Sequence, residues 1–242
     1  MTSDTISRFS VVASLLEEES QLREKLRIRR DELDAAVRLL EIQLGRLHYE
    51  LDWKEALFAA CTQLRTVGLN LQSLQSLIPE GMFYKYNDLW RQCSVHIVQS
   101  CMIIHFLEEG VAATPSDVGA NANDSSEMKA NLAVALVTKE QVLAMLVEDT
   151  VPDQSGLRLD LEEYLLGLCA GIQELTRLAA NRVVLGDYKT PGNIATFCNQ
   201  VYAGFRLLNF RNDSLRRSYD ALKYALQRLD GIQYDLRIRK LA

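Results

Sequence analysis

Proline and glycine are scarce in this chain of 242 residues, which has only 4 Pro and 12 Gly. A fold made of many short strands needs frequent tight turns, and those turns use Gly and Pro. The four prolines (Pro79, Pro115, Pro152 and Pro191) stand far apart and leave long stretches without a helix breaker. The scarcity therefore argues against an all-β protein and predicts an all-α fold.

Cysteine pairs and long apolar runs are also missing. The five cysteines are an odd number, are widely spaced and form no CxxC motif, which favours free thiols in a reducing compartment. No window approaches the ~18 uninterrupted apolar residues of a membrane span. The first residues, MTSDTISRFSVVASLLEEE, fit neither a signal peptide nor a transit peptide. We therefore expect a cytoplasmic or nuclear protein that does not enter a membrane.

Positive charge is in deficit overall, with 27 basic and 32 acidic side chains and a net charge of −5. A protein that binds nucleic acid is normally basic, so the total argues mildly against that function. The distribution is uneven, however, because residues 205–242 hold nine Lys or Arg and four Asp, a local charge of +5. This asymmetry marks the C-terminal region as a candidate surface for a polyanion.

Apolar residues recur at spacings of three and four along most of the chain, the period of helices that bury one face. The pattern predicts seven helices, and because no Pro-, Gly- or charge-rich linker divides them, we expect one domain over residues 1–242. The small, polar segment 110–131 has no period and is expected to be a flexible surface loop. Leucines at heptad spacing in the first and last helices are either bundle core or seams for self-association. The expected helices span about 5–50, 54–77, 80–108, 138–147, 160–183, 191–208 and the region after 214.

Basic side chains recur at helical spacing in three places, and such rows can follow a phosphate backbone. The alternative interpretation is a charged face that is simply solvated. In the segment FYKYNDLWR (83–91), Phe83, Tyr86 and Trp90 form a stripe that is expected to be core, which leaves the basic residues to meet phosphate. The basic candidates from these rows are Arg23, Arg27 and Arg30 of the first helix, Lys85 and Arg91 of the third, and Arg216, Arg217 and Lys223 of the last.

The sequence gives little support for a metal site or a nucleotide-binding loop. Cys93, His96, Cys101 and His105 share one predicted helix but spread over half of its circumference, so core packing is the favoured interpretation over a zinc site. Asp160 and Glu163 could hold Mg²⁺, but their spacing suits helix capping better. No GxxxxGK[ST] or GxGxxG motif is present for a nucleotide phosphate.

The C-terminal third carries a family resemblance. The strings DLEEYLLG (160–167), ELTRLAANRVVLGDYKTPGNIATF (174–197), GFRLLNFRNDSLRRSYDALKY (204–224) and YDLRIR (234–239) resemble the translin family. With FYKYNDLW and the long first helix, the resemblance extends over nearly the whole chain, and segment 110–131 looks like an insertion.

The resemblance implies a seven-helix protomer that assembles into a hollow, barrel-like octamer and binds single-stranded RNA and DNA on basic residues facing the interior. It also implies a partner, translin-associated factor X, with which such proteins form an endoribonuclease that removes passenger strands in RNA silencing or processes tRNA fragments. Arg23 corresponds to a family nucleic-acid contact, and so do Arg211, Arg216 and Arg217. In the third-helix motif the family's arginine and two histidines are replaced by Lys85, Asn87 and Leu89, so binding there is expected to be weaker.

The resemblance also bears on catalysis. The partner's nuclease site uses two glutamates and an aspartate, and this chain aligns Gln99, Met102 and Glu163 with them. Because two of the three carboxylates are missing, Mg²⁺ would lack its ligands. We therefore expect a non-catalytic, nucleic-acid-binding subunit with no cofactor of its own, Mg²⁺ being held by the partner. The alternative is a weak Mg²⁺-dependent endoribonuclease in its own right.

Overall fold

The computed structural model describes residues 2–112, 136–147, 156–211 and 213–241. Over these residues the chain is all-α, as predicted, and most of the predicted loop 110–131 lies outside them. No described helix has an apolar stretch of the length needed to cross a membrane. The elements are α1 (Thr2–Gly45), η1 (Arg46–His48), α2 (Lys54–Gln75), α3 (Phe83–Tyr86), η2 (Asn87–Leu89), α4 (Arg91–Ala112), α6 (Lys139–Leu146), α7 (Leu161–Val184), α8 (Thr190–Phe205) and α9 (Asp213–Ile238).

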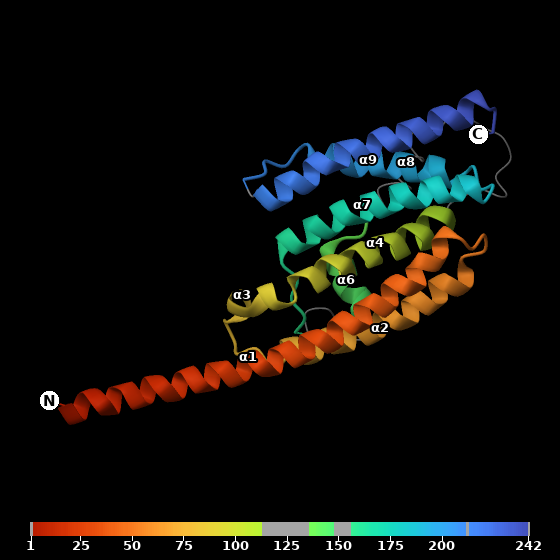
Figure 1. The fold of residues 1–242 in the computed structure, drawn as a ribbon. Helices are drawn as coiled ribbons and strands as arrows, with labels where there is room; N and C mark the ends of the chain where they lie inside the picture. The colour runs from red at the N-terminus through yellow and green to blue at the C-terminus, as the bar shows by residue number, and fades with distance from the viewer. Residues whose placement is uncertain (1, 113–135, 148–155, 212, 242) are drawn as a thin grey trace.

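The long helices lie side by side in a layered bundle (Figure 1). A turn through η1 folds α2 back along α1, and α4 packs on α7, which in turn contacts α8 and α9. The short helix α6 fills the space between α2 and α4. The N-terminal part of α1 extends beyond the other helices, and α3 lies next to α1 at that end of the bundle (Figure 1).

The leucine repeats of α1 and α9 form core within the chain. Leu26, Leu33 and Leu40 of α1 are fully buried, and so are Leu222 and Leu229 of α9. Their burial confirms the first of the two interpretations for these side chains. The apolar residues of the projecting part of α1 are different, because Phe9, Val11, Val12, Leu15 and Leu16 are exposed.

The predicted third helix is interrupted, which corrects the expected span of 80–108. Gly81 has φ +78°, in the left-handed region, so a helix cannot begin at position 80. The chain instead forms α3, then the single 3₁₀ turn η2, and α4 begins only at Arg91. Trp90 lies between the two helices with φ −121°, and its buried indole packs edge-on against Phe83 with centroids 5.7 Å apart.

Side chains cap the N-termini of α6 and α7, and the cap predicted at Asp160 is confirmed. The Thr138 hydroxyl accepts a hydrogen bond from the Gln141 amide at 3.2 Å, and the Gln141 side chain accepts one from the Thr138 amide at 2.7 Å. At the start of α7, the Asp160 carboxylate accepts from the amide of Glu162 at 3.1 Å. These contacts satisfy amides that have no partner within the helix.

Close packing of α6 on α2 depends on Gly68, where a Cβ would lie 1.9 Å from the Leu146 carbonyl oxygen. Because the obstacle is backbone, we expect Gly68→Ala to lower the free energy of unfolding by about 2 kcal/mol through overpacking. Gly231 in α9 has open space around it, so Gly231→Ala should instead stabilise by about 1 kcal/mol through helix propensity. Urea titration of both variants checks the opposite signs, and equal effects would contradict the packing argument.

Candidate nucleic-acid interface

Arg23 and Lys85, two predicted contacts from distant parts of the sequence, meet at one carboxylate. Arg23 Nε and Nη2 donate to Glu19 Oε1 at 3.2 and 3.0 Å, while Lys85 Nζ lies 3.0 Å from Glu19 Oε2. The buried ring of Tyr86 lies beneath both cations, with its centroid 5.5 Å from Arg23 Cζ and 5.3 Å from Lys85 Nζ. We call these four residues the Glu19 clamp.

The clamp is stabilised in its charged form. Hydrogen bonds from Lys85 and then Arg23 lower the pKa of Glu19 below its ordinary value, and the Glu19 carboxylate raises the pKa of Lys85. The electron-rich face of Tyr86 favours the two cations further through cation–π attraction. Two positive groups that converge on one anion in this way have the arrangement that a phosphate also requires.

The other predicted residues near α1 and α3 are also paired or partly covered. Arg27 lies 3.6 Å from Glu24 and is exposed. Arg30 pairs with Asp31 at 3.3 Å and is half-buried, close enough to α4 to act on the Cys93 thiol. Arg91 forms an ion pair with Glu162 of α7. Asn87 is half-buried in η2. The predicted basic row on α1 is therefore not one open strip, because Arg23 and Arg30 turn toward the bundle.

The start of α9 presents a second group of basic side chains. Leu215 and Leu222 face the core, so the arginines between them point to solvent. In the part of the chain that the structure describes, none of these basic groups forms an ion pair within 4.0 Å. We call this group the α9 basic set, and it consists of Arg211, Arg216, Arg217 and Lys223.

The two groups differ in what a phosphate would have to displace. At the Glu19 clamp an acidic side chain already holds both cations, whereas the α9 basic set has no such competitor among the described residues. The start of α9 and the helix α3 lie toward the same end of the bundle (Figure 1).

The cysteines and histidines of α4 do not form one site. Cys93 and Cys101 are buried, and desolvation raises the pKa of the Cys93 thiol to about 11. His96 pairs with Glu41 of α1, which raises its pKa. His105 is buried separately. Within the described residues no three His, Cys, Asp or Glu side chains converge as metal ligands would.

The three residues aligned with the partner's nuclease site do not lie together. Helices α4 and α7 run in the same direction, with Val98 against Gly167 and Met102 against Gly171. Glu163 is two turns before Gly171, about 12 Å along the helix axis. Gln99 lines a pocket further along, with Gln173 and Glu174. Gln99, Met102 and Glu163 therefore do not form one cluster in this fold.

Glu163 is not a surface residue of the α7 first turn, as a capping role implies. Its side chain is 1% exposed, and within the described part of the chain neither carboxylate oxygen has a hydrogen-bond partner of good geometry. Burial raises its pKa to about 7, and the nearby Ser94 hydroxyl of α4 opposes this rise only in part. The cap hydrogen bond is the one that the Asp160 carboxylate accepts from the Glu162 amide.

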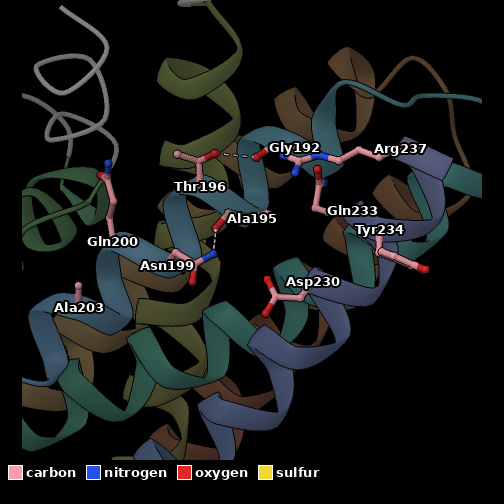
Figure 2. Close-up of a pocket in the computed structure, with 10 residues that line it drawn as sticks. All are labelled: Gly192, Ala195, Thr196, Asn199, Gln200, Ala203, Asp230, Gln233, Tyr234 and Arg237. Atoms are coloured by element: carbon pink, nitrogen blue, oxygen red, sulfur yellow. Dashed lines mark hydrogen bonds between the residues drawn. The ribbon is translucent and has the colours of Figure 1, made fainter. Parts of the chain in front are cut away.

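A groove of about 660 Å³ lies between α8 and α9 (Figure 2). Its wall on α8 consists of small and polar side chains, and the hydroxyl of Thr196 and the amide of Asn199 bond to carbonyls of their own helix. Of the described residues that line it, Asp230 and Arg237 are the charged ones. Among the described residues that line the groove there is no histidine and no cysteine, and Asp230 is the one carboxylate.

Glu19 is the member of the clamp that sequence reasoning missed. Its spacing of four from Arg23 is a visible signal for an ion pair on one helix. Its contact with Lys85 has no signal in the sequence, because 66 positions separate the two residues and only the packing of α3 on α1 joins them.

Comparison with known proteins agrees with this architecture. The family model described as "Translin family" matches residues 21–240. The chain is 31% identical to translin of Homo sapiens over 236 residues, which cover 96% of this chain and 92% of that protein. It is 35% identical to translin of Gallus gallus over 176 residues, 73% of this chain and 66% of that one. Similarity to translin-associated protein X of Mus musculus is confined to 84 residues, at 33% identity over 34% of this chain and 29% of that one. The chain belongs to the Translin family.

Proposed function

We propose that this protein binds single-stranded RNA and DNA and acts as the non-catalytic subunit of a Mg²⁺-dependent endoribonuclease, with translin-associated factor X as the catalytic partner. The observation that carries the proposal is the α9 basic set, four exposed cations without ion pairs among the described residues, in a member of this family. Exposed Arg and Lys bind phosphate through charge and counterion release, with no need for a particular base sequence.

The proposed assembly is a hollow octamer, formed with itself or with the partner, in which the basic groups face the interior. This arrangement reconciles RNA binding with a net charge of −5, because acidic side chains would lie outside and a positive potential would be focused inside. The complex would serve passenger-strand removal or tRNA-fragment processing, in the cytoplasm and also the nucleus.

The first experiment is a pair of gels with a labelled single-stranded RNA and the purified protein. On the native gel we expect a shifted band, and on the denaturing gel an intact RNA both with Mg²⁺ and with EDTA. Cleavage that EDTA abolishes would overturn the non-catalytic assignment and favour the alternative, a weak nuclease, for which Glu163→Gln is the first variant to assay. Absence of any shift would overturn the binding proposal itself.

Salt dependence tests the electrostatic mechanism. If the four cations of the α9 basic set each neutralise one phosphate of a single strand, raising salt from about 50 mM to about 200 mM should weaken binding about 50-fold. Fluorescence anisotropy with a labelled unstructured RNA measures the slope. An affinity that stays constant over this range would contradict a phosphate-based mode of binding.

A further inference from the structure

The Glu19 clamp has the composition of a phosphate site in which the anion is supplied by the protein. One carboxylate oxygen accepts two hydrogen bonds from the Arg23 guanidinium, and the other faces the Lys85 ammonium at 3.0 Å. A phosphate group offers the same pair of oxygens to the same two cations. Glu19 therefore satisfies Arg23 and Lys85 when no nucleic acid is bound.

We propose that Glu19 is an internal competitor for phosphate at the Arg23–Lys85 site, and that it sets the affinity of this surface for single-stranded nucleic acid. This inference rests on the proposed function. It adds Glu19, an acidic residue, to the basic residues that determine the affinity for nucleic acid. A nucleic-acid strand that binds the clamp has to displace the Glu19 carboxylate. Arg23 and Lys85 therefore contribute less to the binding free energy than two free cations would.

The clamp is accessible to a ligand and rests on a buried ring, so a phosphate can replace the Glu19 carboxylate. The side chains of Lys85, Arg23 and Glu19 are 44%, 44% and 32% exposed, so solvent and a ligand can reach all three. Tyr86, in contrast, is buried and keeps its ring under both cations. The Tyr86 ring thus keeps both cations in position, and binding requires only that a phosphate replaces the Glu19 carboxylate.

Lowering the pH moderately does not break the clamp, because Lys85 and Arg23 hold the pKa of Glu19 below its usual value and the carboxylate stays charged. Substitution is therefore the appropriate test. We expect Glu19→Gln to bind an unstructured single-stranded RNA about fivefold more tightly than the unmodified protein at about 0.1 M salt, with a steeper salt dependence, since one additional phosphate is neutralised.

Glu18→Gln is the matched control, because Glu18 is the preceding residue of the same helix, is exposed and gives the same change in net charge. It should change affinity less than twofold. In the Arg23→Ala/Lys85→Ala background, Glu19→Gln should bring no gain, which separates release of the clamp from a general charge effect. Circular dichroism of each variant verifies that α1 remains helical.

The outcomes separate this inference from the function on which it rests. Equal gains in Glu19→Gln and Glu18→Gln, or a gain that persists without Arg23 and Lys85, would overturn the competitor role while RNA binding stands. Weaker binding in Glu19→Gln would show that the carboxylate positions the two cations productively, which also overturns it. Failure of the unmodified protein to bind RNA would overturn the proposed function itself.

Discussion

Replacing Arg216 and Arg217 together by glutamate is expected to weaken binding of single-stranded RNA by at least about 100-fold at about 0.1 M salt. Both side chains are exposed at the start of α9 and form no ion pair with a described residue, so each is available to a phosphate. At this salt concentration one lost phosphate contact on a single strand costs roughly fivefold, and the two introduced carboxylates add repulsion of similar size. Anisotropy titration of a labelled unstructured RNA measures the loss.

The matched control for this double variant is Arg237→Glu/Arg239→Glu. These arginines are also exposed, with Arg237 in the last turn of α9 and Arg239 directly after it, and they give the same change of −4 in net charge. We expect a loss of a few fold at most. If both double variants lose affinity equally, the effect comes from net charge and the α9 basic set is not a specific surface. Thermal unfolding tests that Leu215 and Leu222 still hold α9 on the bundle.

Arg216, Arg217 and Lys223 of the α9 basic set could be predicted from the helical period alone, whereas Arg211 precedes the helix and was predicted from the family resemblance. The apolar positions Leu215, Leu222 and Leu229 fix which face of the helix is buried, and the remaining positions follow from the helical period. The same reasoning predicts that Phe83, Tyr86 and Trp90 are core, and their burial confirms this although Trp90 lies outside α3, between η2 and α4. Periodicity is thus sufficient where one helix decides the exposure of its own side chains.

Periodicity fails where packing against a second helix determines whether a side chain is exposed or paired. Arg30 belongs to the same basic row as Arg27, yet it is half-buried toward α4 because that helix packs on this side of α1. Lys85 was predicted to be available to phosphate, and it is held by Glu19 through the packing of α3. The interruption between α3 and α4 also escaped the pattern, since the apolar stripe of Phe83, Tyr86 and Trp90 continues across η2. Long-range pairing of this kind is not encoded in the spacing of either segment.

Glu163→Gln is expected to raise the free energy of unfolding at about pH 8 by about 2 to 3 kcal/mol. The carboxyl is buried between α7 and α4, and its pKa rises from 4.5 to about 7 because desolvation disfavours the charged form. Each unit of that difference corresponds to about 1.4 kcal/mol of stability. Glutamine has nearly the same shape, carries no charge and can use the Ser94 hydroxyl as a hydrogen-bond partner.

The sign of the pH dependence follows from the direction of this shift. Because the folded protein holds the proton more tightly than the unfolded chain, stability is greatest below pH 4.5 as far as Glu163 is concerned and falls as pH rises to about 7. Urea unfolding at several values between about pH 5 and about pH 8 should therefore show declining stability in the unmodified protein. Glu163→Gln should remove most of that decline.

His96 also makes the protein less stable as pH rises, and the Glu163→Gln variant separates its contribution from that of Glu163. The Glu41 carboxylate raises the pKa of His96, so the stability from that pair is lost at higher pH, above the ordinary value of 6.5. A decline that remains in Glu163→Gln and lies at the upper end of the range belongs to His96, and His96→Gln should abolish it. Glu80→Gln, an exposed position in the loop before α3, controls for loss of a charge and should leave the pH profile unchanged. If the unmodified protein and Glu163→Gln have parallel profiles from about pH 5 to about pH 7, the buried carboxyl is not the group that titrates, and its side chain must find a partner that lowers its pKa in solution.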